Sequence, residues 1–398
     1  MASEEMVKRS TAFDRRSVLL LSGAHMAHDV YPAFLGVLLP LLIDELNISL
    51  AVAGILASTI RWTTSLQPFF GHWADRSDTR YWVILTPALT ASSMSLLGIA
   101  PNTAAVVALL LLAGLSHAAF HPAGGALATR ASGTEWGRGT SYFMTGGEIG
   151  RVIGPLLIAG VVGAWGLRAS PAAVIPGLLA SLVLWRRFGS QTALALKPKP
   201  PARIMTALRS GRTNLLLLSG AVVFRSFANV AIVIYYPTYA TREGATLFVA
   251  AAALAIYELG AVAGTLTGGI LSDRHGRTRI MLFGLLAALP PMFGAVLLGP
   301  TVLGLALLLV AGFLWLSATG VELALMQQLL PENRSTAVGL TYFARAAGAI
   351  VATIAIGFVG DQWGLRAALL GAIGVGALAI AFMAVLPEPD AVTEEQAS

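Results

Sequence analysis

Apolar runs of about twenty residues follow one another along almost the whole chain, and short polar segments separate them. A helix of about twenty apolar residues is long enough to cross the hydrocarbon core of a bilayer. The pattern predicts twelve membrane spans, at residues 17–43, 50–70, 81–99, 103–126, 139–165, 170–187, 213–238, 246–270, 279–298, 301–327, 336–359 and 364–386.

A polar, basic and proline-rich stretch at residues 189–211 interrupts this pattern between the sixth and seventh spans. We interpret it as a linker. The predicted fold is therefore all-α integral membrane, with an N-terminal six-helix bundle at residues 1–188, a cytoplasmic linker at 189–211 and a C-terminal six-helix bundle at 212–398.

Composition supports a bilayer protein. The 398 residues are 56% hydrophobic and only 12% charged, whereas soluble domains carry about 25% charged residues. The chain has no cysteine, which excludes disulfides, thiolate catalysis and cysteine-ligated metals. The net charge of +6 does not indicate a nucleic-acid partner, because the basic residues are spread through short loops rather than gathered on one face.

The distribution of basic residues predicts the orientation in the membrane. The two tails and alternate loops hold 19 of the 26 lysines and arginines, whereas the opposite loops hold only Arg168, Arg242 and Arg366. Basic residues accumulate on the cytoplasmic side of membrane proteins. We therefore expect both termini and the linker in the cytoplasm of a cell inner membrane.

Two segments recur at an offset of 198 residues. Gly71-His-Trp-Ala-Asp75-Arg76 returns as Gly269-Ile-Leu-Ser-Asp273-Arg274, and Trp165-Gly-Leu-Arg168 returns as Trp363-Gly-Leu-Arg366. Duplication of a six-helix unit explains both pairs.

The repeated segment resembles the signature of the major facilitator superfamily, G-x-x-x-D-R-x-G-R-x-R/K. The second copy fits this pattern, while the first has Asp78 in place of a glycine. The resemblance implies two pseudo-symmetric bundles, alternating access, a monomer and no cofactor. The residues it assigns to gating are Gly71, Asp75, Arg76, Arg80, Gly269, Asp273, Arg274 and Arg277.

Motifs in the first half are similar to the fosmidomycin-resistance group of efflux proteins. They are His25-Met-Ala-His28-Asp29, Gln67-Pro68-x-x-Gly71, Ser116-x-x-x-Phe120-His121-Pro122 and Gly146-Gly-x-x-Gly150-x-x-x-Gly154-Pro155. The chain departs from the group pattern at His28, Glu148 and Arg61. These departures concern the substrate rather than the fold.

Ionisable residues within the spans are the candidates for mechanism, because a charge at mid-bilayer costs about 3 kcal/mol and usually faces a partner or water. For proton coupling we select Asp29, His25, His28, Glu148, Glu258 and Glu322. For substrate binding we select Arg225, His117, His121, Arg61, Arg151, Arg345, Tyr236 and Tyr257. The superfamily resemblance places the first, fourth, seventh and tenth spans around a central cavity.

Several of these residues have a second interpretation. His117 and His121 lie one turn apart and can either carry protons or join helices by hydrogen bonds. A zinc-peptidase motif fails because Ala118 stands where a glutamate is needed, and we expect no metal site. Glu148 and Arg151 can simply neutralise each other, or Glu258 can compete for the arginine. The small residues Gly146, Gly150 and Gly154, followed by Pro155, predict close helix packing.

The predicted function is a proton-coupled antiporter that exports a small organic compound, with protons, lipid and a small molecule as its partners. Four intramembrane arginines stay protonated at physiological pH, so an anionic substrate is one option. Import of a small organic anion by symport, a receptor and a membrane enzyme are the alternatives. An enzyme is disfavoured because no nucleophile, metal cluster or phosphate loop appears in the sequence.

Overall fold

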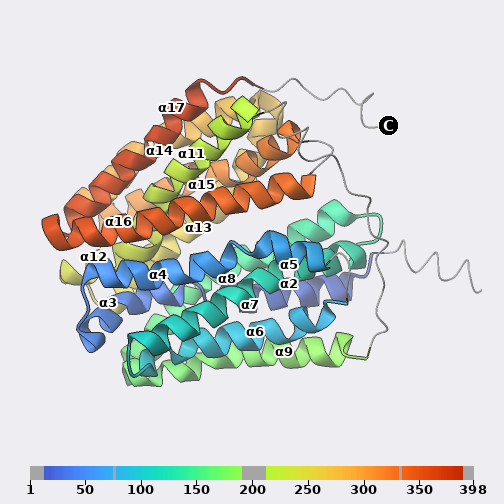
Figure 1. Ribbon diagram of the computed structural model, residues 1–398, viewed down its shortest axis with the longest axis horizontal. Helices are drawn as coiled ribbons and strands as arrows, with labels where there is room; N and C mark the ends of the chain where they lie inside the picture. Colours follow the sequence, from blue (N-terminus) through green and yellow to red (C-terminus); the bar gives the residue numbers. More distant parts are fainter. Residues whose placement is uncertain (1–12, 75–77, 191–211, 331–333, 389–398) are drawn as a thin grey trace, which may run out of the picture. The chain divides into compact units, whose positions relative to one another are not determined.

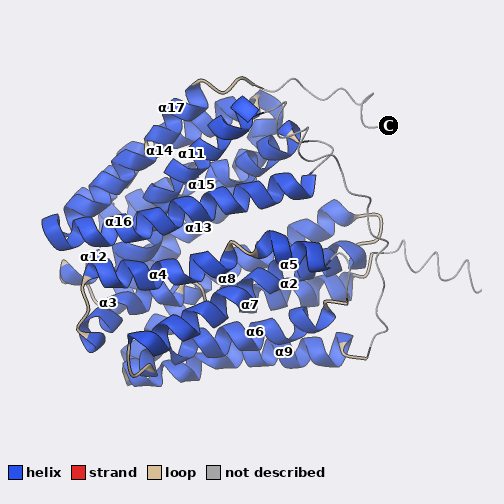
Figure 2. Ribbon diagram, in the orientation of Figure 1, coloured by secondary structure: helices blue, strands red, loops and turns tan. Residues whose placement is uncertain are grey.

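The computed structural model describes residues 13–74, 78–190, 212–330 and 334–388, and in these ranges every regular element is a helix (Figure 2). Ten segments of the described chain are long and apolar enough to cross a membrane. The prediction of an all-α membrane protein is confirmed. Figure 1 follows the helices from α2 near the N-terminus to α17 near the C-terminus.

Three predicted spans are continuous helices that begin at polar N-cap residues. Asn102 accepts a hydrogen bond from the third residue of α7 (Thr103–Ala131), Thr246 does so for α13 (Leu247–His275), and Thr301 for α15 (Val302–Leu329). Such caps satisfy main-chain N–H groups that have no partner within the helix. The other uninterrupted helices are α8 (Trp136–Trp165) and α14 (Arg277–Leu298).

Other predicted spans are divided. The first consists of α2 (Arg15–Asp29) and α3 (Phe34–Leu46), and the second of α4 (Leu50–Thr64) and α5 (Gln67–Ala74). Pro32 lies in the first break, where its ring and missing N–H disrupt the helix. The remaining elements are α6 (Arg80–Ser95), η1 (Leu96–Ile99), η2 (Leu167–Val174), α9 (Ile175–Phe188), α11 (Arg212–Val230), η3 (Ala231–Tyr235), α12 (Tyr236–Arg242), α16 (Arg334–Gly376) and α17 (Leu378–Ala384).

The repeat is visible in the backbone. α8 ends at Gly166 with φ 81°, and α16 breaks at Gly364 with the same φ. Residues that carry a side chain rarely adopt a positive φ of this size, so both copies require glycine at this position. The break at Gly364 divides the last apolar segment in two. With α4–α5 as the second span, each of the twelve predicted spans has a helical counterpart.

Helix contacts divide the chain into two units. The first unit contains Met1–Ile48 and Trp62–Pro198, and the second contains Ser49–Arg61 and Lys199–Ser398. In the second unit, the main-chain N–H groups of Leu50 and Ala51 donate to the Asp361 carboxylate. The start of α4 therefore packs on α16. Most of the predicted linker, residues 191–211, lies outside the described residues.

The glycine motif of α8 lies against α2 in the first unit. A side chain at Gly146, Gly150 or Gly154 would meet main-chain oxygens of residues 22, 26 and 30. Pro155 follows the third glycine within α8. Glycines therefore allow the two helix backbones to approach closely, as small residues do in membrane helix packing.

Candidate functional site

Asp29 lies at the centre of a buried cluster in the first unit. Its Oδ1 is 3.0 Å from His28 Nδ1 and 3.5 Å from His121 Nε2, and its Oδ2 is 3.3 Å from His25 Nε2. The C-terminal part of α2 supplies His25 and His28, while α7 supplies His121 and His117. We call His25, His28, Asp29, His117 and His121 the histidine cluster.

A chain of hydrogen bonds fixes the protonated nitrogen of His28. Ser116 donates to the main-chain oxygen of Thr86 at 3.0 Å, and Thr90 donates to Ser116 Oγ at 2.7 Å. Since the Thr90 proton is used, its oxygen accepts the contact with His28 Nε2 at 3.1 Å. In a neutral ring, His28 Nδ1 then carries a lone pair directed at Asp29.

His25 is fixed in the same way, but here Nδ1 donates to a hydrogen-bond acceptor and Nε2 faces Asp29. Its Nδ1 lies 2.7 Å from the main-chain oxygen of Phe143, an acceptor only, so Nδ1 donates. Its Nε2 is buried and receives no directed hydrogen bond from any described residue. When both rings are neutral, two imidazole lone pairs therefore face one carboxylate. Such a group of acceptors is stable only when it holds a cation or protons.

Aromatic rings hold the imidazoles in place. His28 stacks on Phe120 at 4.2 Å between ring centroids, and His25 stacks on Phe143 at 4.1 Å. His28 and Phe120 are fully buried. On α7, the Nε2 atoms of His117 and His121 lie 2.9 Å apart, and both residues are half-buried. The cluster is accordingly rigid on the α2 side and accessible on the α7 side.

Arg151 of α8 stands between two carboxylates. It forms an ion pair with Glu148 one turn away, and its Nη1 lies 3.9 Å from Asp29 Oδ2. The side chain of Glu148 is 14% exposed, against 5% for Asp29. The pairing of Glu148 with Arg151 was one of the two sequence interpretations, whereas Asp29 as the competing acid was not foreseen.

A second charged group lies within the second unit. Glu322 of α15 is fully buried and pairs with Arg225 of α11, at 2.9 Å between Oε2 and Nε, and with Arg345 of α16. Thr319 completes the group by accepting from both guanidinium groups. No acidic residue lies within one turn of Arg225 on its own helix. Its partner lies 97 residues away.

The two tyrosines selected for substrate binding are buried inside the second unit. Tyr257 donates to Asn229 Oδ1 and Tyr236 to the main-chain oxygen of Ala295. Neither is placed at an open surface. Glu258 is also buried on α13, and Arg61 lies in the last turn of α4.

The gating residues are partly described. Asp75 and Arg76 lie outside the described residues. Arg80 pairs with Asp78 at 2.9 Å, and Arg277 pairs with Asp273 at 3.2 Å. Gly71 packs near Pro122, and Gly269 has open space around it. The second copy turns at Gly276 with φ 95°.

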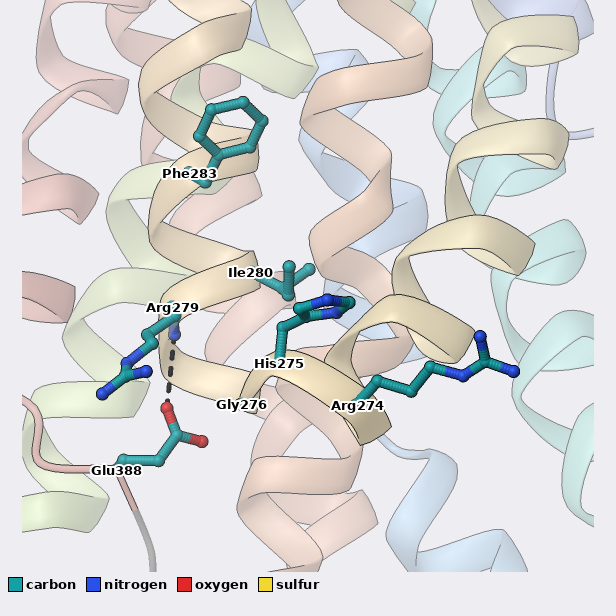
Figure 3. A pocket seen from close by; sticks show the side chains of 7 residues that line it. All are labelled: Arg274, His275, Gly276, Arg279, Ile280, Phe283 and Glu388. Atoms are coloured by element: carbon teal, nitrogen blue, oxygen red, sulfur yellow. Dashed lines mark hydrogen bonds between the residues drawn. The ribbon is translucent and has the colours of Figure 1, made fainter.

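A shallow pocket, open to the surface, lies beside this turn, and the sequence analysis missed one of its lining residues. It is lined by Arg274, His275, Gly276, Arg279, Ile280, Phe283 and Glu388 (Figure 3). The carboxylate of Glu388 accepts from the main-chain N–H groups of residues 277, 278 and 279, and thereby caps α14. No local sequence signal reveals this cap, because Glu388 is 111 residues from the helix start.

Comparison with known proteins identifies the family. The sequence profile of the Major Facilitator Superfamily matches residues 21–353. The chain is 28% identical to the uncharacterised transporter YfnC of Bacillus subtilis, over 93% of this chain and 90% of that protein. It is also 28% identical to the fosmidomycin resistance protein of Escherichia coli, over 94% and 89%. Identity to the E. coli sialic acid transporter NanX is 24%, over 76% of each chain.

Solved structures show the same fold. A bacterial homologue of the human lysosomal transporter Spinster, in an inward-facing unoccupied form, matches with a TM-score of 0.78 at 15% identity, over 93% of this chain and 96% of that one. The nucleoside transporter NupG matches with a TM-score of 0.71 at 15% identity, over 93% and 98%. The predicted resemblance is confirmed. The chain belongs to the Major Facilitator Superfamily and is a multi-pass membrane transporter, not an enzyme.

Proposed function

We propose that this transporter is a proton-coupled antiporter that exports a small organic compound across the inner membrane. The similarity to a fosmidomycin resistance protein supports export. The bias of lysine and arginine toward the tails and alternate loops supports cytoplasmic termini. Alternation between the two membrane sides follows the usual scheme of transporters built from repeats.

The observation that carries proton coupling is the sharing of Arg151 by Glu148 and Asp29. One guanidinium cannot fully neutralise two carboxylates. When Arg151 turns toward Asp29, Glu148 loses its counter-charge, and a bare carboxylate in a membrane is unfavourable unless it takes up a proton. Protonation of Glu148 is thereby coupled to the arrangement of α2 and α8.

The second unit supplies the argument for an anionic substrate. Arg225 and Arg345 share the single carboxylate of Glu322, and the side chain of Arg345 is 27% exposed. Guanidinium groups remain charged and form paired hydrogen bonds with carboxylate, phosphate or phosphonate groups. Arg345 is therefore the more accessible contact for such a group.

Uptake of an organic anion by proton symport is the second candidate. Similarity to a protein named as a sialic acid transporter favours it. Antiport and symport would use the same proton-binding and anion-binding residues. They differ only in whether substrate and protons move in opposite directions or in the same direction.

Transport by the purified protein in liposomes tests the function. A thermal-shift panel of organic anions, cations and neutral compounds would first identify a ligand, and its transport would then be followed with and without an imposed pH gradient. If the protein is an antiporter, substrate should move in the direction opposite to the flow of protons. Movement with the protons would establish symport, and transport indifferent to the gradient would contradict both.

A further inference from the structure

Four residues of the histidine cluster bring metal-ligating atoms together. His28, Asp29, His117 and His121 each offer one nitrogen or oxygen atom, and these four atoms all lie within 4.8 Å of one another. We propose that they form a binding site for a divalent d-block cation, with Zn²⁺ as the reference ion. This reverses the expectation of no metal site, which considered only motifs along one helix.

The spacing of the ligand atoms fits a tetrahedral ion. Zn–N and Zn–O bonds of about 2.0–2.1 Å place neighbouring ligand atoms of a tetrahedral site about 3.3 Å apart. The present separations are 3.0 Å from His28 Nδ1 to Asp29 Oδ1, 3.5 Å from His121 Nε2 to the same oxygen, and 2.9 Å from His121 Nε2 to His117 Nε2. These three separations are close to the tetrahedral value, and the other pairs of ligand atoms lie within 4.8 Å.

The outer hydrogen bonds prepare the ligands. Thr90 accepts from Nε2 of His28, which leaves the lone pair on Nδ1, the atom that faces Asp29. A metal-bound histidine characteristically donates its other N–H in this way, and the bond fixes its tautomer and orientation. The stack on Phe120 fixes the ring itself.

An independent observation is the buried Nε2 of His25. It has no directed hydrogen bond to a described residue and points toward the other oxygen of Asp29 at 3.3 Å. A cation at Asp29 would compensate this lone pair, and His25 can serve as a further ligand. A buried nitrogen that lacks a proton donor is otherwise costly.

The chemical type of the ligand atoms indicates which metal ions the site would bind. Three imidazoles and one carboxylate suit Zn²⁺ and its neighbours Cu²⁺, Ni²⁺ and Co²⁺, whereas Mg²⁺ and Ca²⁺ require mainly oxygen ligands. The ion can enter without unfolding, because the side chain of His121 is 23% exposed and His117 is half-buried. The proposal shares Asp29 with the proposed antiport, but it concerns metal binding, which is measured without transport.

The test uses the purified full chain in detergent, carrying no polyhistidine tag and stripped with a chelator. We expect one equivalent of Co²⁺ to give the visible absorption band of a tetrahedral site, and one equivalent of Zn²⁺ to abolish it. His117→Ala and His121→Ala should each weaken Zn²⁺ binding by about tenfold or more, and Thr90→Val, which removes the outer hydrogen bond, by about tenfold. His275→Ala, at an exposed histidine of α13, is the matched control.

Melting temperatures distinguish loss of metal binding from loss of folding in the variants. Without metal, His117→Ala and His275→Ala should melt as the wild type does. Zn²⁺ should raise the melting temperatures of the wild type and His275→Ala more than those of His117→Ala and His121→Ala. Absence of a stoichiometric Co²⁺ band in the wild type would overturn the proposal. Equal Zn²⁺ affinity of the wild type and the His117→Ala and His121→Ala variants would also overturn it, because the ion would then be adventitious.

Discussion

Glu322 Oε2 lies 2.9 Å from Arg225 Nε, and this ion pair joins α15 to α11, two helices that are far apart in the sequence. Arg345 contacts the other oxygen of the same carboxylate, and Glu322 is fully buried. Removal of the carboxylate leaves two guanidinium groups without their shared counter-charge.

We therefore expect Glu322→Gln to lower stability by about 3–5 kcal/mol, the usual cost of breaking a buried ion pair from one side. Thermal unfolding in detergent measures this loss, and we expect a large fall in the melting temperature of Glu322→Gln. Glu135→Gln removes an exposed partner of Arg138 and should leave the melting temperature near that of the wild type. Equal melting of the two variants would contradict the structural role of Glu322.

The contact of α8 with α2 predicts a second result. A Cβ at Gly150 would press on the main chain at Met26 and Val30, whereas Gly160 on the same helix has open space around it. Gly150→Ala should cost about 1–3 kcal/mol and slow transport, as overpacking does. Gly160→Ala should leave both melting and transport near wild type. A harmless Gly150→Ala would show that the helices do not approach so closely.

Asp14 provides a prediction about pH outside the membrane spans. Burial raises the pKa of its carboxyl, but hydrogen bonds from Ser17 and the charge of Arg187 outweigh burial and hold the pKa below its usual 3.8. A lowered pKa in the folded protein means that the stabilisation is present above about pH 4 and is lost as the pH falls through the folded-state value.

Asp14→Ala should accordingly lower stability by about 1 kcal/mol at neutral pH, because Asp14 also caps α2. The difference in melting temperature between variant and wild type should shrink as the pH falls below about 4. A difference that stays constant with pH would assign the effect to packing rather than to the charge.

Much of the fold could be predicted because long apolar runs reveal membrane helices directly. The repeat of Trp-Gly-Leu-Arg even located Gly166 and Gly364, whose backbones agree. The break at Pro32 was not predicted, because apolar residues flank the proline on both sides and hydropathy averages over it. Helix divisions of this kind depend on local backbone chemistry that hydropathy does not measure.

The candidate sites were harder to predict. Asp29, His25 and His28 stand close together in the sequence, so their proximity in space was foreseeable. The partners of Arg225, the contact between Arg151 and Asp29, and the cap at Glu388 join distant parts of the chain. A single sequence carries no signal for such pairs, since helix periodicity relates only residues on the same helix.

Orientation can be tested because the chain has no cysteine. Ser10→Cys and Gln191→Cys should resist a membrane-impermeant thiol reagent in intact cells and react after the membrane is opened. Arg168→Cys, in a loop predicted on the opposite side, should react in intact cells. Rapid labelling of Ser10→Cys and Gln191→Cys in intact cells would reverse the predicted topology.

The central claim is that Glu148 carries the coupled proton. Glu148→Gln keeps the size of the side chain but cannot ionise, so we expect proton-driven accumulation of substrate to fall at least about tenfold. Exchange of substrate at equal pH should continue, because exchange requires no net proton movement. Glu135→Gln, from an ion pair with the same three-residue spacing on an exposed part of the chain, should retain both activities.

Proton movement during substrate transport in liposomes is the most direct measurement. With a pH-sensitive dye inside, addition of substrate to wild-type liposomes should produce a proton flux opposite to the substrate flux. The account predicts that Glu148→Gln liposomes exchange substrate with no such flux. An undiminished proton flux in Glu148→Gln would contradict it.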